Sequence, residues 1–137
     1  MNEMEILVEL SHEYGGDPAF VVAGGGNTST KVGGVLHVKA SGHALASIGP
    51  EGFVAMDRRA LAELLERDLG DDPVEREERF KQAILEARAE TDTGLRPSVE
   101  CVLHNLMPGT FVVHTHPTVA GGLVCLDSGE QIGRAHV

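Results

Sequence analysis

The stretch Phe111-Val112-Val113-His114-Thr115-His116-Pro117 places two histidines, one residue apart, at the end of an apolar run that a proline stops. In a β-strand, residues i and i+2 point to the same face, so the two imidazoles can converge on one ion. A His-x-His pair at the end of a buried strand can supply two ligands of a metal site. The stretch therefore predicts a strand that ends in a metal centre, with His114 and His116 as ligands.

Further ligands must come from elsewhere in the chain, because a catalytic zinc usually has three protein ligands and an open position. Imidazole suits zinc or another late divalent metal better than magnesium. The side chains that could complete the site are Glu100, His104, His37, His43 and His12.

Glu100 is the carboxylate that we favour near this site. It follows Pro97-Ser98, where we expect a helix to begin, and that helix leads into the His-x-His strand. Beside a metal ion, a glutamate can act as a general acid/base; taken alone, it would be a solvated residue favoured by the helix dipole. His104 lies one helical turn later on the same face, as an outer partner of the ligands or as a hydrogen-bonded core histidine.

A glycine-rich loop, Gly24-Gly25-Gly26-Asn27-Thr28-Ser29-Thr30-Lys31, is expected after a short strand over residues 19–23. Glycines let the backbone approach a ligand closely, and successive N–H groups can bind an anion. The segment matches neither the Walker sequence nor GxGxxG, so it does not by itself indicate a nucleotide. Together with Ser41-Gly42 and Ser98, it suggests a cradle of small residues for a phosphate or hydroxyl group.

The remaining periodicity predicts a mixed α/β domain. We expect strands over residues 35–39 and 53–56, and helices over 2–14, 58–69 and 74–91. Asp57 is a plausible N-cap for the helix over 58–69. In the helix that begins at Pro97, we expect Val99, Leu103, Leu106 and Met107 to face inward.

Composition limits the classes of function. The 137-residue chain suits one domain or a piece of a larger one, and 42% hydrophobic residues are enough for a core. The formal charge of −10 argues against binding to nucleic acid or to an anionic membrane, but leaves an anionic small substrate open. Two cysteines without metal or redox spacing, and no signal-peptide pattern, favour free thiols in the cytoplasm. No apolar run approaches the roughly 20 residues that a membrane span needs.

With GGGNTS, KASG, PSVE and HTHP in this order, the chain resembles the class II aldolase/adducin family from residue 5 to about residue 127. The phrases VVAGGGNTSTK, VKASG, GFVAMDR, RPSVE and FVVHTHPT are most similar to proteins in which a rhamnulose-phosphate-type aldolase precedes a short-chain dehydrogenase. The resemblance implies an α/β fold with three layers, α/β/α, around a central and mostly antiparallel sheet. It also implies a homo-oligomer, commonly a tetramer, in the full-length protein.

The resemblance also implies a site and a reaction. Zinc, or another divalent metal, would be held by three histidines, of which two match His114 and His116 and the third lies beyond the end of this chain. Glu100 matches the acid/base glutamate. The phosphate-binding positions correspond to Gly26, Asn27, Ser41, Gly42 and Ser98. The implied reaction is retro-aldol cleavage of a ketose 1-phosphate, of the rhamnulose or fuculose type, to dihydroxyacetone phosphate and an aldehyde such as lactaldehyde. Related members dehydrate or epimerise sugar phosphates.

The end of the chain has a different character. Residues 131–137 show no periodicity, and they can be back-translated to a read-through of a common sequencing-library adapter. We expect residues 1–130 to be the N-terminal part of an aldolase domain and residues 131–137 to be a non-native tail, so that His136 is no ligand candidate. We expect this fragment alone to be inactive.

Two other classes compete with the aldolase. A JAMM-type metalloprotease uses HxHP followed by a serine and an aspartate; Asp127 has the spacing of the aspartate, but Val124 stands in place of the serine. That class also leaves GGGNTS, KASG and PSVE unexplained. An adducin-like, non-catalytic scaffold predicts lost zinc ligands, whereas Glu100, His114 and His116 are present.

Overall fold

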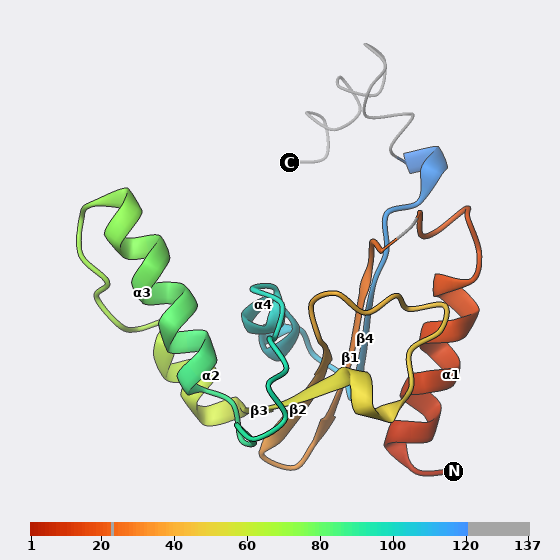
Figure 1. Cartoon of the computed structure of the whole chain (residues 1–137), viewed down its shortest axis with the longest axis horizontal. Coiled ribbons are helices and arrows are strands. Elements are labelled where there is room, and N and C mark those ends of the chain that lie inside the picture. The colour runs from red at the N-terminus through yellow and green to blue at the C-terminus, as the bar shows by residue number, and fades with distance from the viewer. Residues whose placement is uncertain (23, 121–137) are drawn as a thin grey trace.

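A four-stranded antiparallel sheet separates two groups of helices in the computed structural model of the chain (Figure 1). The structure describes residues 1–22 and 24–120. The strand order is β3-β2-β1-β4, and the strands are β1 (Asn27–Val32), β2 (Val35–Lys39), β3 (Phe53–Asp57) and β4 (Phe111–His114). Helix α1 (Glu3–Gly15) lies on one face; α4 (Cys101–Leu106), with α2 (Arg58–Leu64) and α3 (Pro73–Glu86) beyond it, lies on the other. The predicted three-layer α/β fold with an antiparallel sheet is confirmed.

Strand β1 corrects the prediction for the glycine-rich segment. Residues 18–20 form a turn rather than part of a strand over 19–23, and only Gly24–Gly26 lead into the sheet as a loop. From Asn27 onward the chain is a strand, because its backbone pairs with β2 on one edge and with β4 on the other. Its short polar side chains are buried, so polarity alone gave the wrong prediction.

Helix α1 is fixed to β1 by a buried pair of hydroxyl groups. Ser11 Oγ donates to Leu7 O at 2.7 Å and lies 2.7 Å from Thr28 Oγ1. Because the single Ser11 proton is used on the carbonyl, Thr28 donates the second bond. Leu7 also packs with Ile48 and Phe53 in an apolar cluster on this face.

The larger core lies between the sheet and α2, α3 and α4. Both α2 and α3 are shorter than the ranges 58–69 and 74–91 predicted. Helix α3 stops because the segment after it bonds to the edge of β3, where Asp57 N donates to Ala87 O at 2.7 Å and Ala89 N donates to Ala55 O at 2.8 Å. The buried members of this core are Leu36, Val38, Ala40, Val54, Met56, Leu61, Leu64, Ala83, Ile84, Ala87, Cys101 and Val102.

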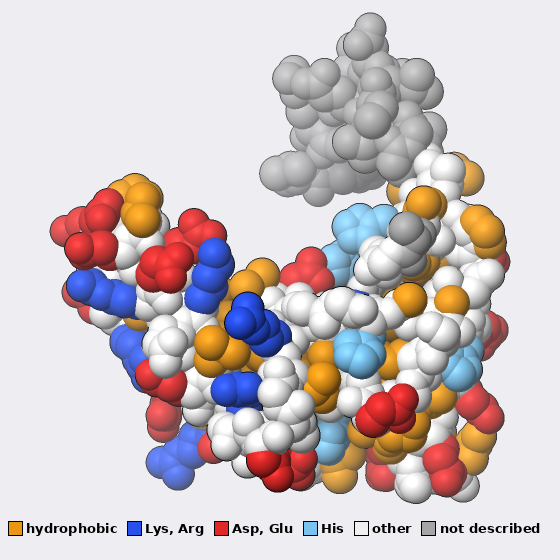
Figure 2. Space-filling view, in the orientation of Figure 1, with side chains coloured by type: hydrophobic (Ala, Val, Ile, Leu, Met, Phe, Trp, Pro, Cys, Tyr) orange, Lys and Arg blue, Asp and Glu red, His pale blue; other side chains and the backbone are white. Residues whose placement is uncertain are grey.

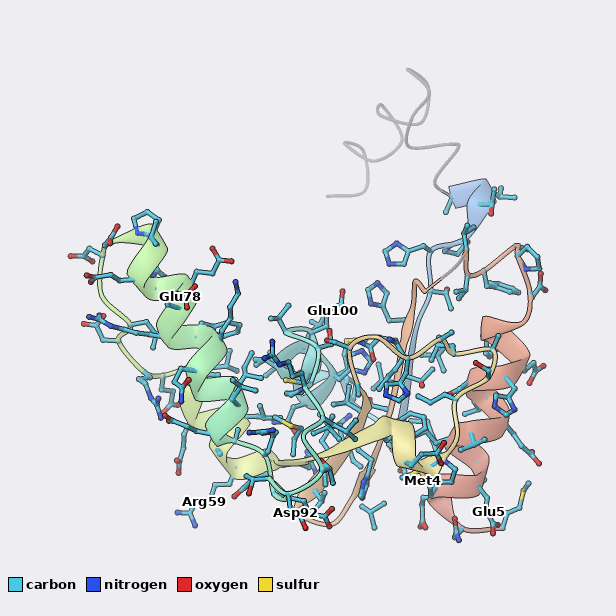
Figure 3. The ribbon with its side chains drawn as sticks, viewed as in Figure 1. Met4, Glu5, Arg59, Glu78, Asp92 and Glu100 are labelled. Carbon is cyan, nitrogen blue, oxygen red and sulfur yellow. The ribbon has the colours of Figure 1, made fainter. Side chains whose placement is uncertain are left out.

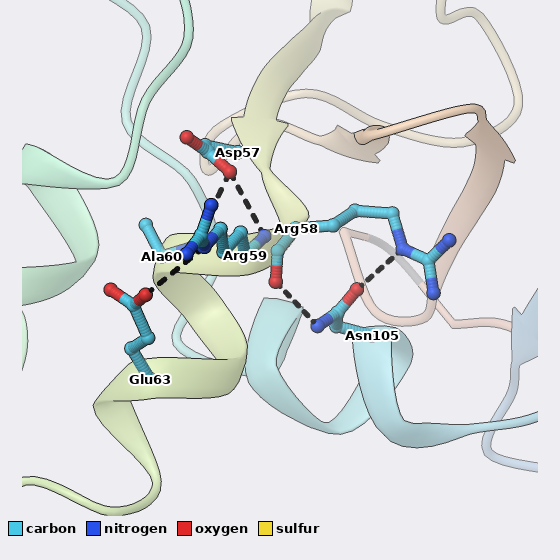
Figure 4. A network of polar contacts seen from close by, with 6 residues as sticks. All are labelled: Asp57, Arg58, Arg59, Ala60, Glu63 and Asn105. Atoms are coloured by element: carbon cyan, nitrogen blue, oxygen red, sulfur yellow. Dashed lines mark hydrogen bonds and ion pairs between the residues drawn. The ribbon is translucent and has the colours of Figure 1, made fainter.

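A two-way clamp joins the start of α2 to the end of α4 (Figure 4). Asp57 caps α2, as predicted, by accepting from Arg59 N at 2.9 Å and from Ala60 N at 3.3 Å. Arg58 Nε donates to Asn105 Oδ1 at 2.9 Å, and Asn105 Nδ2 donates to Arg58 O at 3.1 Å. The clamp holds α4 in place at the end away from Glu100.

Helix α4 has a different start and a different inner face from those predicted. Its N-cap is Glu100, while Pro97 forms an isolated bridge with Ala40. Buried on α4 are Cys101, Val102 and His104. The residues predicted to face inward are exposed instead: Val99, Leu103, Leu106 and Met107.

Several sequence predictions concern residues that the structure leaves undescribed. These are the tail over 131–137 and the positions Val124, Cys125 and Asp127. Among the described residues, no helix combines the length and the apolar character needed to cross a membrane.

Two adjacent leucines of the α2 segment test the packing of the larger core. Leu64 is 3% exposed and Leu65 is 50% exposed. We expect Leu64→Ala to lower the free energy of unfolding by about 2–5 kcal/mol, because it leaves a cavity. The matched Leu65→Ala should change it by no more than about 0.5 kcal/mol. Urea unfolding measures both, and equal losses would contradict this packing.

Candidate metal centre

Three side chains on one face of β1 make polar contacts with α4 and the segment after it. Residues i, i+2 and i+4 of a strand share a face, while positions one turn apart share a face of a helix. We call these contacts the β1–α4 ladder. Its members are Asn27 Nδ2 to Glu100 Oε2 at 3.3 Å, Ser29 Oγ to His104 Nδ1 at 2.7 Å, and Lys31 Nζ to the carbonyls of Met107 and Gly109. The ladder places Glu100 at the start of β1.

The pairing of β4 with β1 brings His114 to the same point. Asn27 stands directly opposite His114 in this antiparallel pair. His114 Nδ1 lies 3.2 Å from Glu100 Oε2, the oxygen that Asn27 also contacts. One nitrogen or oxygen atom from each of Glu100, His104 and His114 lies within 4.8 Å of the others. Glu100 and His114 are only half-buried, so solvent and small molecules can reach them.

His116 lies at the rim of this cluster. Its ring centroid is 4.8 Å from that of His114, and the two ring planes are tilted by 40°. It follows the end of β4 and is exposed, and its backbone N–H donates to Phe20 O at 2.9 Å. The structure thus puts the two rings side by side, but the cluster of three ligand atoms does not contain His116. Its role as a ligand stays a prediction.

The donor set fits a late divalent metal ion. Metal–ligand bonds of about 2.0–2.1 Å in a tetrahedral site separate two ligand atoms by about 3.3–3.4 Å. The 3.2 Å between His114 Nδ1 and Glu100 Oε2 is close to this separation. The same distance also allows a protonated Nδ1 to donate to the carboxylate while Nε2 stays free for the ion, an arrangement common in zinc sites. The other candidates, His12, His37 and His43, are not in the cluster, and His12 Nε2 bonds to Ile48 O at 2.7 Å.

Three of the positions predicted to bind phosphate lie on the segments next to Glu100. Gly26 has φ of 79°, and a Cβ there would lie 3.1 Å from His114 O, so only glycine suits this approach. Asn27 is buried beside Glu100. Ser98 Oγ accepts from Glu100 N at 3.2 Å. The contacts of Asn27 and Ser98 with Glu100 are findings, and phosphate binding at all three positions stays a prediction.

The Ser41-Gly42 turn lies against the segment that carries Ser98. Ser41 N donates to Arg96 O at 2.8 Å, and the neighbouring residues Ala40 and Pro97 form a bridge. Both Ser41 and Gly42 are exposed, and Gly42 has φ of 86°. The three small-residue segments therefore meet at one end of the sheet.

Two buried ionisable groups lie near the site, and the sequence left the role of each open. His104 is 1% exposed, and burial lowers its pKa to about 4, against an opposing effect of the Glu100 carboxylate. Lys39 is 6% exposed, and its ammonium donates to Ala40 O and His43 O. Burial lowers the pKa of Lys39, while Glu100 raises it. The i+4 spacing from Glu100 was the available signal for His104; strand alternation gave none for Lys39.

Cys101, next to Glu100 in the chain, is an unsuitable ligand. It is fully buried, and burial raises the pKa of its thiol to about 12. A metal binds the thiolate, so this cysteine stays a core residue.

The site lies apart from most of the basic surface. Figure 3 shows Glu100 above α4, with its carboxylate pointing to the top of the view. In Figure 2, most of the visible lysine and arginine side chains lie over the half of the molecule that contains α2 and α3, whereas the visible histidines lie over the half that contains the sheet and α1. The histidines visible on this face are therefore concentrated on the sheet half.

Comparisons with known proteins agree with this arrangement. Residues 5–136 match the family model described as class II aldolase and adducin N-terminal domain. The chain is 31% identical over 138 residues to the uncharacterized oxidoreductase YuxG of Bacillus subtilis, a match that covers 94% of this chain and 19% of that protein. It is also similar to the structure of the N-terminal class II aldolase domain of a conserved protein from Thermoplasma acidophilum, with a TM-score of 0.79 and 28% identity. That match covers 97% of this chain and 64% of the other. The chain thus spans about a fifth of the length of YuxG.

Zinc affinity tests the metal centre. We expect His114→Ala to weaken zinc binding by more than the roughly 10–100-fold that loss of an outer partner costs, because it removes a ligand. His12→Ala should leave the affinity unchanged, since His12 is bonded to Ile48 O outside the cluster. Competition with a chromophoric chelator measures both variants. Equal affinities in the two variants would contradict the site.

The burial of His104 predicts a pH dependence of stability in the metal-free chain. Its pKa is about 4 in the folded protein and 6.5 when unperturbed, so between these values the unfolded state binds a proton that the folded state does not. The stabilisation is therefore complete above about pH 6.5 and is lost as the pH falls towards 4, by about 3 kcal/mol. Urea unfolding of His104→Gln, with chelator present, should show a smaller loss over this range. An identical loss in both proteins would refute the prediction.

Proposed function

Because the chain belongs to the class II aldolase and adducin N-terminal domain family, we propose that it is part of a zinc-dependent aldolase. Its substrate would be a ketose 1-phosphate of the rhamnulose or fuculose type, and its products dihydroxyacetone phosphate and an aldehyde such as lactaldehyde. The observation that carries the proposal is the position of Glu100. Its carboxylate lies 3.2 Å from His114 Nδ1 and 3.3 Å from Asn27 Nδ2 at the open end of the sheet.

Glu100 would act as the general acid/base of the reaction. Retro-aldol cleavage removes the proton of the hydroxyl group that becomes the aldehyde, and it returns a proton to the carbon left on the other product. A half-exposed carboxylate that is oriented by an amide can do both, because it touches solvent as well as the site. Asn27 would hold in place Oε2, the carboxylate oxygen that also lies beside His114.

His114 and His116 would hold the metal ion. When bound, a divalent ion such as zinc acts as a Lewis acid towards the substrate's keto oxygen. The side-by-side rings support this assignment, since their centroids lie 4.8 Å apart. A third histidine outside the described residues would complete the set of zinc ligands.

The small-residue segments would hold the phosphate. Gly26, Asn27, Ser41, Gly42 and Ser98 offer backbone N–H, amide and hydroxyl donors at one end of the sheet. Lys39 supports this use, because its ammonium bonds the carbonyls on both sides of Ser41-Gly42 and puts a positive charge beneath that turn. Within the described ranges this ammonium forms no ion pair with a carboxylate, although the charge of Glu100 acts on it, and a buried ammonium favours an anion nearby.

The proposal extends to the polypeptide that carries this domain. YuxG is much longer than this chain and is called an oxidoreductase. We therefore propose that the domain works beside a dehydrogenase segment, and that the natural polypeptide forms a homo-oligomer. The aldehyde released by cleavage would be a substrate for such a segment.

Glu100→Gln tests the function in the natural-length polypeptide. Cleavage of rhamnulose 1-phosphate should fall about 10²–10⁴-fold in kcat, because the amide cannot exchange the protons. Zinc content, measured by atomic absorption, should stay at the wild-type level. Release of dihydroxyacetone phosphate, coupled to its reduction, follows the reaction.

Glu66→Gln is the matched control, since Glu66 is exposed on the segment after α2. Undiminished turnover in Glu100→Gln would remove Glu100 from its role. Epimerised or dehydrated product without carbon–carbon cleavage would replace the aldolase by another reaction of the same scaffold, and metal binding without any turnover would indicate a scaffold.

A further inference from the structure

His104 has a nitrogen atom that the fold does not use. The side chain is 1% exposed, and its Nδ1 lies 2.7 Å from Ser29 Oγ. Its Nε2 is buried and has no hydrogen-bond partner among residues 1–22 and 24–120. Leaving such a group unpaired costs about 1–3 kcal/mol, so its presence beside a reactive carboxylate needs an explanation.

The bond to Ser29 indicates which nitrogen carries the proton. In the described part of the chain, Ser29 Oγ has His104 as its single partner, and Ser29 is fully buried. If Ser29 donates to Nδ1, only the Nε2–H group is left without a partner. If Nδ1–H donates instead, both the Ser29 proton and the Nε2 lone pair are unpaired. The first arrangement leaves fewer buried groups unsatisfied, so His104 carries its proton on Nε2.

Glu100 offers an acceptor that matches this donor. Both contacts to its carboxylate, from Asn27 and from His114, are made to Oε2, and Oε1 accepts no hydrogen bond within the described ranges. His104 lies one turn after Glu100 on α4, and its backbone N–H donates to Glu100 O at 3.0 Å. The two side chains belong to the cluster whose ligand atoms lie within 4.8 Å. The unpaired donor and the unused acceptor thus belong to two side chains of the same cluster.

We propose that His104 is a positioning residue for Glu100: Ser29 holds the ring with the proton on Nε2, and this N–H donates to the Glu100 carboxylate when the site is loaded. The carboxylate is then held by Asn27 and His104, and His114 becomes available to the metal ion. This role rests on the function proposed for Glu100.

The first test is independent of activity. Nitrogen-15 NMR of the imidazoles in the 137-residue chain reports the tautomer of each ring, and His104→Gln assigns the His104 signals. We expect the Nε2–H tautomer without zinc and with zinc. Ser29→Ala should give a mixture of tautomers, because the selecting donor is gone. A Nδ1–H tautomer, or an Nε2 signal that moves to a metal-bound position on addition of zinc, would overturn the proposal and make His104 a ligand.

The second test separates positioning from packing in the natural-length polypeptide. His104→Leu keeps most of the volume but removes the donor, whereas the side-chain amide of His104→Gln can still donate. We expect His104→Leu to lower kcat for ketose 1-phosphate cleavage about 10-fold or more with KM and zinc affinity unchanged, and His104→Gln to restore most of it.

Equal kcat values in the two variants, or a loss of zinc affinity as large as that in His114→Ala, would contradict positioning. The two failures can be told apart. If the wild-type polypeptide cleaves no ketose phosphate, the proposed function fails, and the tautomer of His104 is still decided by NMR.

Discussion

The β1–α4 ladder is the constraint on which the site depends. Strand β1 lies inside the sheet, with β2 on one edge and β4 on the other, so neither edge is free to shift. One face of β1 bonds α1 through Thr28 and Ser11, and the other bonds α4 through Asn27, Ser29 and Lys31. Moving the strand by one residue would exchange the two faces and leave these buried groups unpaired. The polar contacts therefore specify one register.

That register determines where the side chains of the candidate site lie. Because Asn27 stands opposite His114 and also contacts Glu100, the strand pairing and the helix position converge on one carboxylate oxygen. Glu100 and His114 are 14 positions apart in sequence, with α4 and a turn between them. The clamp between Arg58 and Asn105 holds the other end of α4. The candidate metal centre is thus supported by regular elements on two sides, with His116 at its rim.

Much of the fold could be predicted from sequence where the signal is local and apolar. The alternation of Val35–Lys39 and the cap at Asp57 gave β2 and the start of α2. The polar run Asn27–Thr30 looked like a loop, because its burial comes from strands distant in sequence. Val99 and Leu103 were placed inside because they are apolar, but the bond between His104 and Ser29 sets the rotation of α4. The proximity of Glu100 to His114 was predicted from order along the chain; its geometry required the sheet register.

X-ray absorption spectroscopy of the zinc-loaded chain tests most directly whether this register builds a metal centre. The account predicts nitrogen or oxygen donors at about 2.0–2.1 Å with imidazole scattering. That scattering should decrease in His114→Ala and persist in His12→Ala, since His12 lies outside the cluster. A spectrum explained by oxygen donors alone, and unchanged when His114 is replaced, would contradict the account.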